Sequence, residues 1–120
     1  MKVLADTSVW VDHFRGADPS LVNLLNDDTV LMHPFVLGEL ACGNLARRSQ
    51  VLAKLAALPA ALQAEDAEVL DLIENKKLYG LGIGWVDAHL ITSALLSDCN
   101  LMTSDQRLKK AARQAGARVS

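Results

Sequence analysis

The chain has 120 residues, 51% of them hydrophobic and 22% charged, a composition that describes one globular domain over residues 1–120 and excludes a disordered or collagen-like protein. The formal net charge of −2 excludes a domain that is basic throughout, although five of the 12 basic residues lie in the last 14 positions. No apolar run reaches the roughly 18–20 residues that cross a membrane. Because the two cysteines lack a CxxC partner, we expect them to be small core residues of a cytoplasmic protein.

The first half of the chain alternates short apolar strands with helices. Gly16 and Pro34 mark the end of one helix and the start of another, and Asp18 is expected to cap a helix that has Pro19 at its first position. The predicted strands cover residues 2–5 and 29–32, and the predicted helices cover residues 7–16, 18–26, 34–43 and 47–58.

The second half continues the same alternation. Acids begin the helix predicted at residues 65–80, and Lys76 and Lys77 lie near its end, as the helix dipole favours. A glycine-rich connector at residues 79–84 leads into a mostly apolar helix. The predicted strands cover residues 60–64, 100–103 and 117–120, and the other predicted helices cover residues 85–97 and 105–116.

This order of elements predicts an α/β fold. Strands that alternate with helices pair in parallel through right-handed crossovers. The strands are short and apolar without polar alternation, which is typical of a sheet covered on both faces. We therefore expect a three-layer α/β/α sandwich with a short, mainly parallel sheet.

Four of the 14 acidic residues lie in unusual places. Glu39 has Phe35, Val36 and Cys42 on the same helical face, and Asp87 shares its face with apolar residues in the same way. An unpaired carboxylate buried on such a face would cost several kcal/mol or shift its pKa upward. Both helices are therefore expected to direct an acid towards the interior or towards a cleft.

The other two acids, Asp6 and Asp105, follow predicted strands. The carboxyl ends of parallel strands lie along one edge of the sheet, and ligands bind there where the strand order reverses. Four carboxylates that meet at this edge could not all remain ionised without a cation. Mg²⁺ or Mn²⁺, which takes oxygen ligands and often bridges carboxylates to phosphate, would resolve that repulsion.

Simpler interpretations of these residues remain open at this point. Asp6 could cap the helix that follows it, and Asp87 could favour the start of its helix through the dipole. At residues 103–106 a capping box is possible, with Thr103 as the N-cap and Gln106 at the third helical position, which would make Asp105 an ordinary acid of the first turn.

Four segments resemble the motifs of PIN-domain ribonucleases, most closely the VapC-type toxins of bacterial toxin–antitoxin pairs. They are "LADTSVWVDHFRG", "PFVLGELACG", "GWVDAHLITSA" and "LMTSDQRL", and they occur in register over essentially the whole chain. The resemblance implies a PIN-like fold in which the metal ligands are Asp6, Glu39, Asp87 and Asp105. It also implies catalytic roles for Thr103, as the hydroxyl before the fourth acid, and for Ser8, near the metal-bound waters.

The activity implied is Mg²⁺- or Mn²⁺-dependent hydrolysis of RNA, in which the metal activates a water that attacks a phosphodiester. The resemblance also implies a homodimer and a small VapB-like antitoxin that blocks the acidic groove. Basic residues near the acids are candidates for contacts with RNA phosphates: Arg15, Arg107, Lys109 and Lys110.

Three alternatives remain. A PIN nuclease of RNA processing would have no antitoxin. A phosphatase that works through an aspartyl-phosphate should have a second Asp two residues after the first, where this chain has Ser8. A non-catalytic α/β interaction module would give no reason for acids on apolar helix faces.

Overall fold

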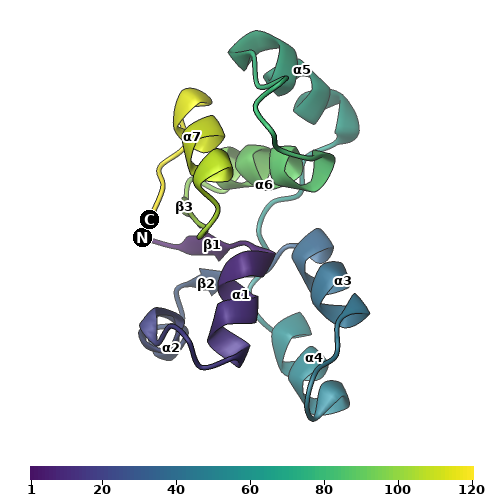
Figure 1. Cartoon of the computed structure of the whole chain (residues 1–120), viewed down its shortest axis with the longest axis vertical. Coiled ribbons are helices and arrows are strands. Elements are labelled where there is room, and N and C mark those ends of the chain that lie inside the picture. The colour runs from purple at the N-terminus through teal and green to yellow at the C-terminus, as the bar shows by residue number, and fades with distance from the viewer.

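The computed structural model describes all residues, 1–120, and confirms the predicted α/β fold (Figure 1). The three strands are β1 (Val3–Ala5), β2 (Val30–Leu31) and β3 (Asn100–Met102). All pair in parallel in the order β2-β1-β3, and Val3 lies opposite Val30 on one side and Asn100 on the other. The strand order reverses beside β1, so the edge beyond Ala5 and Met102 is where a ligand site is expected.

Seven helices surround the sheet, and their bounds follow the predicted pattern closely. In Figure 1 the first four gather at one end of the long axis and the last three at the other, with the strands between them. They are α1 (Thr7–Phe14), α2 (Ser20–Asn26), α3 (Pro34–Cys42), α4 (Arg48–Ala56), α5 (Asp66–Lys76), α6 (Trp85–Leu96) and α7 (Gln106–Gln114). No helix is both long enough and apolar enough to span a bilayer.

The first residues of α1 and α3 show how the local sequence determines where these helices begin. The carboxylate of Asp6 accepts a hydrogen bond from the backbone N–H of Val9 at 3.1 Å, so Asp6 is the N-cap of α1. Pro34 occupies the first turn of α3, and the Nδ1 of His33 accepts from the N–H of Phe35 at 3.0 Å. Each cap satisfies a backbone donor that the helix leaves unpaired.

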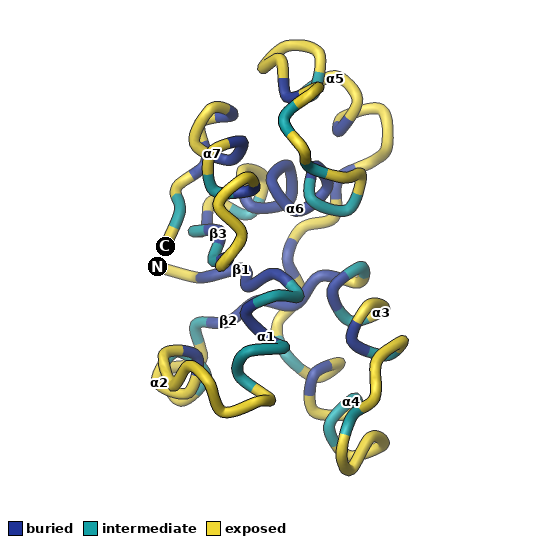
Figure 2. Tube along the Cα trace, viewed as in Figure 1, coloured by how far each residue is buried: buried dark blue, intermediate teal, exposed yellow.

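The core explains why α6 and α7 look so different in sequence. Residues 88–94 of α6 are all buried, because this helix packs against β3 on one side and α5 on another. By contrast, α7 buries only one face, with Leu108, Ala111 and Ala112, so buried and exposed residues alternate along it (Figure 2).

Several predicted details were wrong. The segments at residues 60–64 and 117–120 make only single bridges, Met32 to Ala60 and Leu101 to Val119, rather than strands. Too few residues there lie in register with a neighbour to continue a ladder.

One cap and one cysteine also differ from the prediction. Helix α2 begins at Ser20, one residue later than expected, although Asp18 still accepts from the N–H of Ser20 at 2.9 Å. Cys99 is buried as predicted, whereas Cys42 is exposed because it ends α3 on the outer surface.

Candidate active site

Asp6 is the centre of a hydrogen-bond network at the predicted edge of the sheet. Its side chain is buried, 6% exposed, directly after β1. One oxygen, Oδ1, accepts from the Ser8 hydroxyl at 2.6 Å as well as from Val9, and the other, Oδ2, accepts from the Thr103 hydroxyl. Asp6 therefore caps α1 through Oδ1 and contacts the segment after β3 through Oδ2, since its two oxygens serve different partners.

The same network reaches across the sheet to the segment after β3. The N–H of Asp105 donates to the Thr103 hydroxyl at 3.0 Å, and the hydroxyl of Ser104 donates to the Ser8 hydroxyl at 2.9 Å. The Ser104–Ser8 contact joins residues 96 positions apart in sequence, and the Thr103–Asp6 contact joins residues 97 positions apart. The ends of β1 and β3 are thus held together by side chains as well as by the ladder.

Asp105, not Thr103, is the N-cap of α7, so the predicted capping box is wrong. The Asp105 carboxylate accepts from the N–H of Arg107 at 2.9 Å and from that of Leu108 at 3.4 Å. Thr103 lies too far upstream for that role, and its hydroxyl is used by Asp6 and Asp105 instead. Only one oxygen of Asp105 is occupied in this way, and the residue is exposed.

Asp87 approaches this network from the first turn of α6. It is half-buried, and one of its oxygens accepts from the N–H of Gly84 at 3.1 Å. Burial raises the pKa of its carboxyl group, and the charges of Asp105 and Asp6 raise that pKa further, whereas the Gly84 hydrogen bond lowers it. Three carboxylates therefore repel one another at this edge of the sheet.

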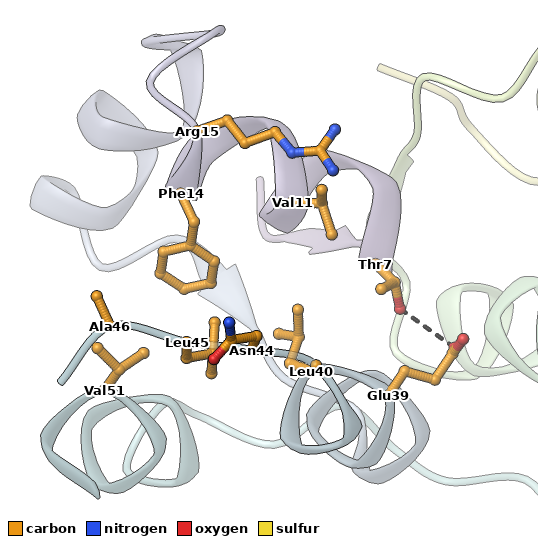
Figure 3. A pocket seen from close by; sticks show the side chains of 11 residues that line it. Thr7, Val11, Phe14, Arg15, Glu39, Leu40, Asn44, Leu45, Ala46 and Val51 are labelled. Carbon is orange, nitrogen blue, oxygen red and sulfur yellow. Dashed lines mark hydrogen bonds between the residues drawn. The ribbon is translucent and has the colours of Figure 1, made fainter. Parts of the chain in front are cut away.

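Glu39 joins the edge from α3, where it is exposed and lines a groove, the second of the two positions predicted for it, rather than the interior. The apolar faces of α3 extend around most of the helix, so the stripe in the sequence did not identify the buried face. The Glu39 carboxylate accepts from the Thr7 hydroxyl at 3.1 Å, which places it beside the start of α1 (Figure 3). No three acidic, histidine or cysteine side chains are arranged closely enough to hold one ion in this structure.

A groove of about 550 Å³ runs from Glu39 between α1 and the α3–α4 segment (Figure 3). Thr7 and Arg15 lie at opposite ends of its α1 wall, and the Arg15 side chain extends back along α1 so that its guanidinium group lies near Val11. Phe14 and Leu40 make the middle of the groove apolar. Arg15 therefore lines the groove that ends at Glu39, and its contact with an RNA phosphate stays a prediction.

The remaining basic candidates lie on α7. Arg107 is exposed near the acidic edge, one turn or less from Asp105, whereas Lys109 and Lys110 follow farther along the helix and make no ion pair. The sequence did not single out Thr7, Ser104 and Gly84, whose contacts hold the predicted residues in place. Their proximity to predicted residues in sequence was the only signal, because small polar residues and glycines are common in turns.

Comparison with known proteins settles the family. The PIN domain model matches residues 3–114. The chain belongs to the PIN-domain family. It is 44% identical over 119 residues to "Ribonuclease VapC32" of two Mycobacterium tuberculosis strains, CDC 1551 / Oshkosh and ATCC 25618 / H37Rv, which covers 98% of this chain and 96% of each relative.

A solved structure gives the same fold at much lower sequence identity. The crystal structure of PAE2754 from Pyrobaculum aerophilum superposes with a TM-score of 0.59 and 18% identity, covering 97% of this chain and 90% of that one. The predicted PIN-like architecture and the resemblance to VapC-type proteins are both confirmed.

Proposed function

We propose that this PIN-domain protein is a metal-dependent endoribonuclease and the toxin of a toxin–antitoxin pair. The observation that carries the proposal is the convergence of Asp6, Asp87 and Asp105 at the point where the strand order reverses, with a raised pKa at Asp87. The high identity to proteins named as VapC ribonucleases supports the reaction class.

The residues at this edge fit a hard divalent cation. Their carboxylates supply oxygen ligands, and their mutual repulsion would be relieved by a positive charge. On each of Asp87 and Asp105, one oxygen accepts no hydrogen bond from the protein. Mg²⁺ keeps several waters and commonly takes only one or two protein carboxylates, so three direct ligands are not required.

Asp6 would reach the ion through Oδ2. Its Oδ1 already accepts two hydrogen bonds, from Ser8 and Val9, whereas Oδ2 accepts only one, from Thr103. A carboxylate oxygen offers about two acceptor positions, so Oδ2 has one left. Thr103 and Ser8 would therefore fix the direction of the remaining lone pair rather than compete for it.

When bound, Mg²⁺ or Mn²⁺ would activate a water and stabilise the charge that develops on the phosphate. The protein itself would orient the acids through the network around Asp6 and hold Asp87 by the Gly84 amide. Glu39, which accepts a hydrogen bond from the Thr7 hydroxyl, would close the site on its exposed side and supply a further carboxylate to it.

We further propose a small VapB-like antitoxin, an RNA substrate and a homodimer in the cytoplasm. The groove of Figure 3 ends at Glu39, so a polypeptide segment bound along its apolar floor would finish beside the acids and exclude RNA. A PIN nuclease of RNA processing would need no such partner. A neighbouring reading frame for a small DNA-binding protein would support the toxin, and rescue of growth by that protein would establish the pair.

The proposal is tested by brief expression in cells followed by sequencing of newly formed RNA 5′ ends, with an Asp6→Ala variant as the control. We expect new ends at a small set of RNA positions that are absent with the variant. Identical 5′ ends for the two proteins would contradict endoribonuclease activity at this site.

A further inference from the structure

Arg107 packs against a glycine that has no space for a side chain. Gly82 has a φ of +80°, and a Cβ placed on it would lie 2.9 Å from Cδ of Arg107, 3.3 Å from Nη1 and 3.4 Å from Nε. The stem and part of the guanidinium group therefore lie directly on the Gly82 backbone. A methyl group at this position would displace the arginine.

This contact lies between two segments that carry acids of the site. The N–H of Arg107 donates to Asp105, which follows β3. Gly82 belongs to the loop that ends at Gly84, whose N–H donates to Asp87. The Arg107 side chain thus bridges the Asp105 segment and the Asp87 segment at the rim of the acidic edge.

The charge of Arg107 is not neutralised by any carboxylate. No acidic oxygen lies within 4.0 Å of its guanidinium, although the neighbouring acids are numerous. Arg118 shows the contrast, because it is paired with Asp98 at 2.7 Å. An arginine presents five N–H donors in a planar fork that matches a phosphate, so the donors of Arg107 remain available to a ligand.

We propose that Arg107 binds a phosphate of the RNA strand next to the phosphate that is cleaved, and that Gly82 is the residue that positions it. The inference rests on the proposed ribonuclease function and adds a substrate-binding residue to it. Arg107 supplies positive charge where the RNA backbone must approach a cluster of acids. Gly82 holds the side chain flat, so that the guanidinium faces the strand rather than folding onto Asp105.

Gly80 offers a matched control in the same loop. Its φ is +72°, so alanine there meets a backbone strain similar to that at Gly82, but a Cβ at Gly80 has no heavy atom within 4 Å. Gly80→Ala and Gly82→Ala should therefore lower the thermal unfolding midpoint by similar amounts. Only Gly82→Ala should also move Arg107.

The test measures the binding of a fluorescein-labelled, single-stranded RNA of mixed sequence in EDTA over a series of NaCl concentrations. All proteins carry Asp87→Asn, which prevents cleavage and reduces repulsion. We expect Arg107→Ala to weaken binding roughly tenfold and to reduce the slope of log affinity against log salt by about 0.7, the contribution of one phosphate contact. Arg107→Lys should retain the slope and recover part of the affinity.

Gly82→Ala should change affinity in the same direction as Arg107→Ala, whereas Gly80→Ala should leave affinity and slope at the parent values. Equal RNA affinities for the two glycine variants would contradict the positioning role of Gly82. An unchanged salt slope in Arg107→Ala, or no RNA binding by the parent, would overturn the phosphate contact. Failure of the ribonuclease function would appear separately, as the absence of Mn²⁺-dependent RNA cleavage by the wild-type protein.

Discussion

Asp6 and Glu39 occupy two corners of the same acidic edge, and the protein holds them in different ways. Asp6 is buried, and both of its oxygens accept hydrogen bonds from the protein. Glu39 is exposed and has one hydrogen bond, to Thr7. The comparison indicates that folding fixes the Asp6 carboxylate, whereas the exposed Glu39 carboxylate keeps more conformational freedom.

The largest effect is expected for the acids on the Asp6 side. Asp6→Asn and Asp87→Asn should each lower RNA cleavage by at least about a hundredfold, because each would remove a negative charge from the proposed metal site. Both variants should fold, since an asparagine oxygen can still cap α1 or accept from Gly84. Cleavage rates are measured for variants whose folding is checked by circular dichroism. Full activity in a folded Asp87→Asn variant would contradict a catalytic role of this edge.

Thr103→Val should have the next largest effect, because it removes the hydroxyl that orients Asp6. It leaves Oδ2 of Asp6 and the N–H of Asp105 without this partner, at a cost of about 1–3 kcal/mol of unfolding free energy for the unsatisfied groups. We expect roughly tenfold slower cleavage as the carboxylate loses its fixed direction.

Thr92→Val is the matched control for that change. Thr92 is also buried, but its hydroxyl donates to the carbonyl of Ala88 within α6. Urea denaturation should show destabilisation in both variants, with slower cleavage only in Thr103→Val. Equal cleavage by both would mean that the Thr103 hydroxyl has a purely structural role.

Glu39→Gln should lower RNA cleavage with little change in the free energy of unfolding. Because Glu39 is exposed, its unfolding free energy should change by less than about 0.5 kcal/mol, while cleavage falls by less than in Asp6→Asn. Glu74→Gln, on the exposed face of α5, provides the control for loss of a surface charge. A strongly destabilised Glu39→Gln protein would show that the two corners are held alike.

The smallest effect on cleavage is expected from His33, which caps the helix that carries Glu39. Burial, together with a smaller effect of the nearby His89, lowers the pKa of His33 to about 4. As the pH falls below about 6.5, His33 is therefore protonated in the unfolded chain but stays neutral in the folded protein. This contribution to stability is complete above that pH and is lost as the pH falls towards 4.

The pH series of urea midpoints should show that loss, and His33→Asn, which can still cap α3, should reduce it. A midpoint that falls equally steeply with pH in both proteins would place the acid sensitivity elsewhere. The comparison of the two pH series shows whether stability around α3, the helix that carries Glu39, depends on a neutral His33.

The sequence could predict much of the fold because strand–helix alternation and apolar patterning agree along the chain. Every predicted helix is present, and Asp6 and Asp105 follow strands as expected. What the sequence could not decide was burial. The apolar pattern around Glu39 suggested a buried face, and only the packing of α3 against its neighbours shows that the carboxylate is exposed.

The hydrogen bond between Thr103 and Asp6 could not be predicted from the sequence either. Local patterns left a helix cap and a metal ligand as interpretations of Asp6, and the structure shows that the cap uses Oδ1 while Oδ2 accepts from Thr103. The Thr103 contact joins residues 97 positions apart, which no local pattern can show. Long-range contacts of single hydroxyl groups depend on strand register, and register appears only in three dimensions.

Calorimetric titration with Mn²⁺ tests most directly whether the acids at this edge form a metal site. The wild-type protein should bind Mn²⁺ saturably at the acidic edge, Glu39→Gln should bind it more weakly, and Asp6→Asn and Asp87→Asn should lose most of that binding. Mn²⁺ binding of equal strength in the wild-type and Asp87→Asn proteins, or no binding by the wild-type protein, would contradict the account.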